Sequence, residues 1–308
     1  MKKNNYQNIL LIKHGAFGDL IQCDGALRAI RDLYRDANIT LLTTPPFESL
    51  MTRCPHIDEL IVDPRVSLWK LSQQFKLIKQ LRDKHYQLII DLQNSDRTRL
   101  YQKLVSRRCD WSGSIPNMKP RSGLEGLAIQ LEELGIARKN VFAPDIKWMA
   151  DDVTNLLAAN QVNKSYIVLI PGCSAKHPEK RWTYYAQLAS SLIDKGYDVI
   201  NIIGPEEEEL ALSLPGHTKL KKNGYLTWFE LAGVLNQAHF IIGNDTGPSH
   251  IASCLRKPGY ALFGPHTSAI RAEISRDNFQ AIEVEDLSEL SAETVLEYIL
   301  ASELLVDN

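Results

Sequence analysis

The chain has 308 residues, of which 44% are hydrophobic and 23% charged, and its formal net charge is −2 at pH 7. This length is ample for two domains, and the composition is that of an ordinary globular protein. The charge excludes a general basic surface for nucleic acid, and no apolar run approaches the roughly 18 residues of a membrane span. The N-terminal apolar stretch is also shorter than a secretory signal requires, so we expect a cytoplasmic protein.

The cysteines and the short motifs of the sequence argue against disulfide bonds and metal sites. The cysteines are Cys23, Cys54, Cys109, Cys173 and Cys254. Their odd number and wide spacing predict buried thiols rather than a disulfide framework or a zinc site. The sequence contains no HExxH, GxxxxGK[ST] or DxD motif, so it predicts no metal site.

In the first half, short apolar segments alternate with stretches of helical periodicity. The predicted strands are 9–13, 39–43, 59–62, 87–92 and 108–112, and the predicted helices are 19–35, 67–84 and 96–105. Strands with little polar alternation are typical of parallel sheets that are covered on both faces. The pattern therefore predicts a doubly wound α/β domain over residues 1–150.

After a looser region at 113–147, the same rhythm restarts. The predicted strands are 166–170, 198–203, 239–243 and 259–263, and the predicted helices are 182–196, 205–213, 227–237, 248–256 and 288–304. We expect a second Rossmann-like domain over residues 151–308, whose last helix is able to pack back on the first domain. Ligands of open α/β sheets bind outside the carboxyl ends of the strands, so the strand-to-helix loops are the candidate sites.

The first such loop is KHGAFGD, residues 13–19, and it ends in an acid at the start of a helix. Taken alone, Asp19 is most simply an N-cap or first-turn acid. The loop lacks the GxGxxG order of a dinucleotide fingerprint. Across a cleft from cationic loops in the second half, however, this carboxylate is suited to act as general base for an acceptor hydroxyl.

The second loop, IPGCSAKHPEKRW at 170–182, gathers cations ahead of a predicted helix. Because cations are repelled by a helix N-terminus, a bound phosphate explains them better than a solvated basic loop does. Cys173 and Ser174 are not framed by the GxSxG turn of a nucleophile.

The third loop precedes a run of glutamates at 206–209. The helix dipole stabilises acids in a first turn, which explains most of them, and one is available to reach a ribose hydroxyl.

The fourth loop, in FIIGNDTGPSHIA at 240–252, places Gly247 and Pro248 at a helix start. Exposed N–H groups there favour an anion such as a diphosphate, although an ordinary helix capped by Asp245 or Thr246 explains the pattern equally well. A hydrolase that uses Asp245, Ser249 and His250 is disfavoured, because adjacent side chains on a helix point apart.

Three stretches together resemble the heptosyltransferases, glycosyltransferase family 9. They are LLIKHGAFGDLIQCDGALRAIR, IPGCSAKHPEKRW and FIIGNDTGPSHIASCLRKPGYALFGPHTS. The resemblance implies the GT-B fold, with two Rossmann-like parallel-sheet domains facing across a cleft, the first for the acceptor and the second for the nucleotide-sugar. It also implies inverting transfer of a heptose or related sugar from an ADP-sugar to the lipopolysaccharide core or a related glycan of a bacterium, without metal or cofactor.

The resemblance also implies roles for individual residues. Asp19 matches the proposed base, and Lys180 matches the lysine that holds the diphosphate at the catalytic centre. The implied nucleotide and diphosphate residues are Ser174, Lys176, Lys180, Glu207, Asp245, Thr246, Gly247, Pro248, Ser249 and His250. The expected acceptor residues are Lys13, His14, Gly18, Arg97 and Arg121. Glu207 is chosen from the four glutamates, and Ala175-Lys176 departs from the hydroxyl pair that members often carry.

The partners follow from the same resemblance. We expect ADP-heptose or a similar nucleotide-sugar as donor, an anionic glycolipid as acceptor, and no nucleic acid. The segment 97–108 is either a solvated amphipathic helix or a surface that rests on the cytoplasmic face of the inner membrane. Two alternatives stay open: a GT-B transferase with another nucleotide-sugar, and a nucleotide-sugar-binding protein without turnover.

Overall fold

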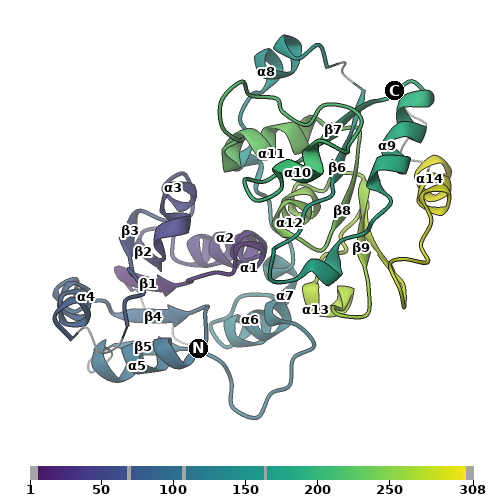
Figure 1. The fold of residues 1–308 in the computed structure, drawn as a ribbon. Helices are drawn as coiled ribbons and strands as arrows, with labels where there is room; N and C mark the ends of the chain where they lie inside the picture. The colour runs from purple at the N-terminus through teal and green to yellow at the C-terminus, as the bar shows by residue number, and fades with distance from the viewer. Residues whose placement is uncertain (1–5, 68–70, 106–108, 163–164, 303–308) are drawn as a thin grey trace. The chain divides into compact units, whose positions relative to one another are not determined.

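The computed structural model describes residues 6–67, 71–105, 109–162 and 165–302 (Figure 1). The chain divides into two compact units, Met1–Trp148 and Met149–Asn308. Each unit has one five-stranded sheet with helices packed around it. Among the helices of the described residues, none combines the length and the apolar character that a membrane crossing requires.

The sheet of the first unit has the strand order β3-β2-β1-β4-β5, and all of its neighbouring strands are parallel. The strands are β1 (Asn8–Ile12), β2 (Asn38–Thr43), β3 (Glu59–Val62), β4 (Leu88–Asp91) and β5 (Asp110–Ser112). Ile9 of β1 pairs with Ile39 on one side and with Leu88 on the other. Because the strand order reverses between β1 and β4, the loops after these two strands form the switch point where ligands bind.

The helices of the first unit differ from the prediction in several places: one predicted helix is divided, and the helices at 48–51, 123–132 and 138–141 were not predicted. They are α1 (Phe17–Gln22), α2 (Asp24–Leu33), α3 (Glu48–Met51), α4 (Leu71–Asp83), α5 (Asp96–Val105), α6 (Gly123–Glu132) and α7 (Arg138–Val141), with 3-10 turns η1 (Pro45–Phe47) and η2 (Lys147–Met149). The helix predicted over 19–35 is interrupted at Cys23, and α2 begins with Asp24. The carboxylate of Asp24 is buried and accepts hydrogen bonds from Trp148 Nε1 (3.0 Å) and Asp145 N (2.8 Å).

Another difference is α6, which lies inside the stretch predicted to be irregular. Ser122 caps this helix, and its Oγ accepts a hydrogen bond from Glu125 N (3.0 Å). Leu127 and Leu131 are buried and lie on one face of the helix. The glycines and the preceding proline concealed this periodicity in the sequence.

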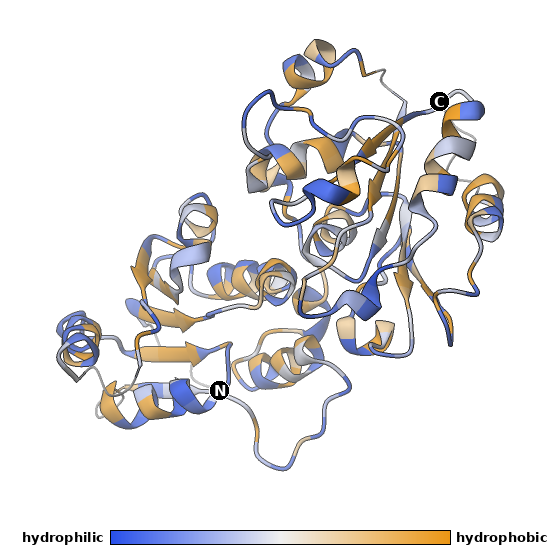
Figure 2. Cartoon of the chain, viewed as in Figure 1, coloured by the Kyte–Doolittle hydropathy of each residue, from blue (hydrophilic) through white to orange (hydrophobic). Residues whose placement is uncertain are grey.

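The second unit repeats the design with the strand order β10-β9-β8-β6-β7, again all parallel. Its strands are β6 (Tyr166–Ile170), β7 (Asp198–Asn201), β8 (Phe240–Asn244), β9 (Gly259–Phe263) and β10 (Phe279–Glu283). The strands of both sheets are mostly hydrophobic (Figure 2), as expected of sheets covered on both faces. The predicted parallel α/β class is confirmed, whereas β10, an edge strand with Phe279 as its fully buried residue, was not predicted.

The helices of the second unit are α8 (Thr154–Ala159), α9 (Tyr185–Asp194), α10 (Glu208–Ala211), α11 (Trp228–Gln237), α12 (Gly247–Cys254), α13 (Ala269–Ala272) and α14 (Ala292–Ala301), with the 3-10 turn η3 (Pro178–Lys180). The last helix, α14, packs on α9, and its Val295 and Ile299 join the same hydrophobic cluster as Leu188 and Leu192. Part of its apolar face is therefore buried within the second unit, and the expectation that this helix packs back on the first domain stays a prediction. Residues 68–70, 106–108 and 303–304 of the predicted elements lie outside the described residues.

Candidate active site

The loop after β1 brings the first candidate residues to the carboxyl edge of the sheet. Gly15 has φ +128°, and a Cβ there would lie 2.7 Å from Cε2 of Phe47, so this turn requires glycine. Lys13 is only 6% exposed, and its ammonium donates a hydrogen bond to Leu92 O (3.4 Å). Asp19 lies in the first turn of α1 and is exposed, so its carboxylate is accessible to a ligand.

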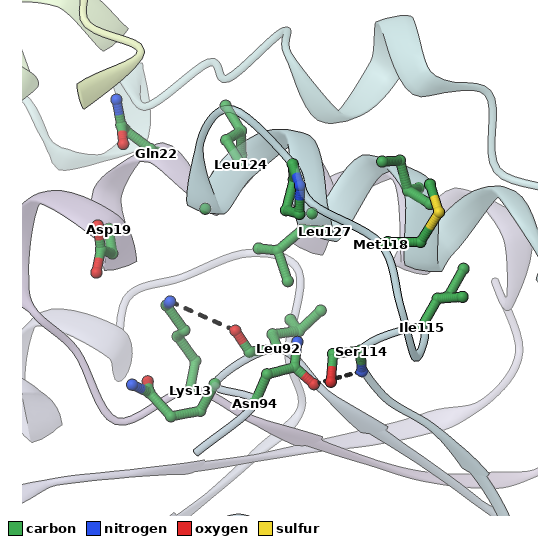
Figure 3. Close-up of a pocket in the computed structure, with 15 residues that line it drawn as sticks. Lys13, Asp19, Gln22, Leu92, Asn94, Ser114, Ile115, Met118, Leu124 and Leu127 are labelled. Carbon is green, nitrogen blue, oxygen red and sulfur yellow. Dashed lines mark hydrogen bonds between the residues drawn. The ribbon is translucent and has the colours of Figure 1, made fainter. Parts of the chain in front are cut away.

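A pocket of about 290 Å³ opens beside Asp19. The residues that line it come from the loops after β1, β4 and β5 and from α1 and α6: Lys13, Asp19, Gln22, Leu92, Gln93, Asn94, Ser114, Ile115, Met118, Pro120, Gly123, Leu124, Gly126, Leu127 and Ile129. Figure 3 shows Asp19 and Gln22 at one end, Ile115 and Met118 at the other, and Lys13 pointing towards Leu92. The pocket therefore lies at the switch point of the first sheet.

His14 and Arg97 belong to a buried network around Asp63. The Asp63 carboxylate accepts hydrogen bonds from Arg97 Nε (3.0 Å) and Tyr101 Oη (2.6 Å), and it lies 3.6 Å from His14 Nε2. The pKa of His14 is lowered to about 4, mainly by burial and also by the nearby cations, while the charge of Asp63 opposes this shift. Burial alone would raise the pKa of Asp63, but hydrogen bonds from Tyr101, Arg65 N and Arg97 lower it. At pH 7 the network therefore holds a neutral imidazole and an ionised carboxylate.

The guanidinium group of Arg97 is already paired within this network. Its Nη1 also donates to Val66 O (3.1 Å), and its side chain is 14% exposed. Arg121 is exposed but pairs with Glu125 at the start of α6, with 3.3 Å between Nη2 and Oε1. Both of these expected acceptor residues thus carry an internal carboxylate partner. Gly18 lies in α1 next to Asp19, half-buried.

In the second unit, an ion pair stands at the carboxyl end of β8. Lys180 Nζ lies 2.6 Å from Asp245 Oδ2, and His250 Nε2 lies 3.5 Å from Asp245 Oδ1. Burial alone would raise the pKa of Asp245, but hydrogen bonds from His250 and Lys180, with their charges, hold it at about 2. The structure therefore joins the KRW lysine to the turn before α12.

Glu207 stands out from the other glutamates of its run. Its carboxylate accepts hydrogen bonds from Cys173 N (2.8 Å) and Gly204 N (3.0 Å), and Arg181 Nη2 lies 3.9 Å away. A Cβ at Gly172 would overlap this carboxylate, so any larger residue there would displace Glu207 from these hydrogen bonds. Glu207 thus ties the loop after β6 to the loop after β7.

The turn into α12 presents a mixture of accessible and buried groups. Thr246 is the N-cap residue, Gly247 and Pro248 begin the helix, and all three are half-buried. Ser249 is fully buried, and its hydroxyl donates to Asn244 O (2.6 Å), which argues against its use as a nucleophile. In the loop after β6, Ser174 and Lys176 are exposed.

Asn244, at the end of β8, is a site residue that the sequence did not single out. Its Nδ2 donates to Pro171 O (2.9 Å) and Gly172 O (3.1 Å), while its Oδ1 accepts from Trp182 N (3.1 Å). Asn244 therefore holds the loop after β6 in place through hydrogen bonds to its backbone. The available signal in the sequence was an asparagine directly after the predicted strand 239–243. Among the residues that the structure describes, no three His, Cys, Asp or Glu side chains are grouped to hold a metal ion.

Comparison with known proteins gives the family. The family model described as glycosyltransferase family 9 (heptosyltransferase) matches residues 127–296, more than half of the chain. The chain is 27% identical over 295 residues to lipopolysaccharide heptosyltransferase 2 of Escherichia coli K12, covering 83% of this chain and 82% of that protein. It is 25% identical over 279 residues to lipopolysaccharide heptosyltransferase 3 of Escherichia coli, covering 80% of each.

Solved structures show the same fold. A glycosyl transferase of family 9 from Veillonella parvula matches with a TM-score of 0.81 at 19% identity, over 99% of this chain and 98% of that one. ADP-heptose lps heptosyltransferase II of Escherichia coli matches with a TM-score of 0.75 at 22% identity, over 97% and 99%. The fold is therefore GT-B, as the sequence resemblance implied. The chain belongs to glycosyltransferase family 9, the heptosyltransferases, and is a glycosyltransferase.

Proposed function

We propose that this protein transfers a heptose from ADP-heptose to the lipopolysaccharide core or a related glycan, with inversion and without a metal ion. The donor is supported by relatives whose structures are named for it: a heptosyltransferase of Escherichia coli with ADP, and the same enzyme with ADP-2-deoxy-2-fluoro heptose. The observation that carries the proposal is the exposed carboxylate of Asp19 at the edge of the pocket in the first unit.

Asp19 is the proposed general base. It accepts the proton of the acceptor hydroxyl as that oxygen attacks the anomeric carbon in line. A carboxylate is a weak base, but it suffices because the sugar centre is already oxocarbenium-like in the transition state. Inversion follows from a single displacement, in which the new bond forms on the face opposite the departing diphosphate.

The loops of the second unit are the proposed diphosphate site. Charge develops on the leaving ADP as the glycosidic bond breaks, and Lys180 with the N–H groups at the start of α12 supplies positive potential there. Lys180 is paired with Asp245 in the structure, so the diphosphate competes with this carboxylate for the ammonium. Glu207 is the proposed ribose contact, since its carboxylate is the one turned towards the loop after β6.

The acceptor is proposed to be an anionic glycolipid at the cytoplasmic face of the inner membrane. A surface of α4 and α5 supports contact with anionic lipid, because it combines an exposed aromatic ring with cations. Phe75 is 70% exposed, and Lys76, Lys79 and Lys103 are exposed on the same two packed helices. Lysines near an anionic membrane contribute about 1 kcal/mol each.

Transfer from a panel of sugar nucleotides tests the proposal. We expect product from ADP-heptose and an acceptor glycan, with the anomeric configuration inverted by NMR and the rate unchanged by a chelator. We also expect ADP to inhibit more strongly than UDP or GDP. Preference for a UDP- or GDP-sugar would replace the donor, and tight ADP-heptose binding without product from any acceptor would indicate a binding protein.

A further inference from the structure

The pocket beside Asp19 has a polar end and an apolar side. Of the described residues that line it, the charged ones are Lys13 and Asp19, whose charges balance. The apolar side is formed by Leu92, Ile115, Met118, Pro120, Leu124, Leu127 and Ile129. Its volume of about 290 Å³ is near the lower limit of about 300 Å³ for ligand pockets, so it suits one sugar ring rather than an oligosaccharide.

One side chain fixes the segment that supplies part of this apolar side. Asn94 Oδ1 accepts a hydrogen bond from Ser114 N (2.7 Å), directly before Ile115. The dashed line in Figure 3 marks this contact, which spans 20 positions of sequence. Because Ser114 itself is exposed, this bond anchors a segment that otherwise lies at the surface.

Asn94 is in turn held by α6. Its Nδ2 donates to Gln130 Oε1 (2.9 Å), and Gln130 is 1% exposed. Gln130 Nε2 donates to Asp91 O (3.1 Å) and Ser112 Oγ (3.2 Å). Asn94 has φ +50°, a left-handed conformation that asparagine tolerates better than most residues. The amide is therefore fixed on both sides, and its orientation is determined by its partners.

The same loop is joined to the loop that carries Asp19. Gln93 Oε1 accepts a hydrogen bond from His14 N (2.9 Å), while Gln93 N donates to Asp91 Oδ1 (3.0 Å). Asn94 N donates to the same carboxylate oxygen (2.9 Å). The apolar wall and the base are thus held by neighbouring residues of one loop.

We propose that Asn94 is a positioning residue for the acceptor: it fixes Ile115 and Met118 as a wall against which an uncharged sugar ring packs its C–H face beside Asp19. This inference rests on the proposed function and names its acceptor ring. The anionic groups of the glycolipid lie outside the pocket, because Lys13 is the one cation in its described lining and its ammonium already donates a hydrogen bond to Leu92 O. Methionine suits such a wall because its side chain adapts to the shape it meets.

Two variants and a matched control test the wall. Asn94→Ala removes the anchor of Ser114, and Met118→Ser removes an apolar contact from a residue that is 49% exposed, so folding is spared. Asn140→Ala, at an exposed position of α7 in the same unit, is the control. The probes are lipid-free core oligosaccharides that end in a neutral heptose or in an acidic sugar, with ADP-heptose as donor.

We expect the wild type to prefer the neutral terminus. Asn94→Ala and Met118→Ser should raise the acceptor KM about tenfold, equivalent to about 1.4 kcal/mol, while kcat and the donor KM stay within about twofold and the control is unchanged. An unchanged acceptor KM in both variants, an equal rise in donor KM, or a preference for the acidic terminus would overturn the inference. Should Asn94→Ala fail to fold, Met118→Ser decides.

Direct titration separates this inference from the proposed function. Calorimetric binding of the same oligosaccharides without donor should be weakened by both variants. If the wild type forms no product from ADP-heptose but binds the neutral oligosaccharide and loses it in the variants, the proposed function fails and the inference stands. If product forms while the variants bind normally, the inference fails alone.

Discussion

Replacing Lys180 with alanine tests the ion pair at the end of β8. The Lys180 and Asp245 side chains are 20% and 8% exposed and lie 2.6 Å apart, so the pair is largely removed from water. Without the ammonium, Asp245 retains His250 at 3.5 Å. Breaking a fully buried pair costs about 3–5 kcal/mol and an exposed one at most about 1 kcal/mol, so we expect a loss of about 2–3 kcal/mol.

The pH dependence follows from the titration of Asp245. Burial opposes its ionisation, but hydrogen bonds from His250 and Lys180 bring its pKa to about 2, below the reference value of 3.8. At about 1.4 kcal/mol per unit, the ionised state contributes roughly 2 kcal/mol at neutral pH. Because the folded pKa is the lower one, this contribution is present above about pH 4 and is lost as the pH falls towards 2.

Thermal unfolding at pH 7 and at pH 3 measures both effects. A loss of 2–3 kcal/mol lowers Tm by about 4–12 °C for a unit of this size, and the difference from wild type should narrow at pH 3. Lys176→Ala removes an exposed cation of the same loop and should leave Tm unchanged. An unchanged Tm in Lys180→Ala at pH 7, or an equal difference at both pH values, would refute the reasoning.

Two further substitutions probe other parts of the molecule. Gly172→Ala places a Cβ on the Glu207 carboxylate, so it should weaken ADP binding, measured by calorimetry, and lower the stability by about 1–3 kcal/mol. Gly123→Ala is the control, because no atom is found within 4 Å of the Cβ added there. Equal effects of the two substitutions would contradict the account. Phe75→Ser with Lys79→Glu should reduce co-sedimentation with vesicles of anionic phospholipid at least about tenfold while leaving turnover of a lipid-free acceptor unchanged. Undiminished sedimentation would show that this surface does not meet the membrane.

The strands were predictable because their environment is uniform. The last four residues of β1 and all five of β6 are hydrophobic in succession and buried, so composition alone identifies these strands. The edge strand β10 has five residues, of which Phe279 is buried and the other four are half-buried or exposed, so its sequence pattern is too short and too mixed to identify a strand. The apolar face of α6 was present in the sequence, but Gly123 and Gly126 interrupt it with residues typical of loops.

In the candidate site, too, the features that local sequence encodes were predictable and the long-range contacts were not. Local motifs indicated Asp19, Lys180 and the turn before α12, because a glycine turn and a helix start are properties of neighbouring residues. The partners of those groups come from distant positions: Asp63 lies 34 residues from Arg97, and Cys173 lies 34 residues from Glu207. No local pattern encodes such a pairing, so the sequence could not show that Arg97 is occupied by Asp63.

The most direct test of the account is the substitution Asp19→Asn. An amide of the same shape cannot accept the hydroxyl proton as a base, so transfer should fall by about 10²–10⁴-fold. ADP affinity, measured by calorimetry, should stay within about twofold of wild type, because the proposed diphosphate site lies in the second unit. Transfer at the wild-type rate by Asp19→Asn, with ADP still bound, would contradict the assignment of this carboxylate as the catalytic base.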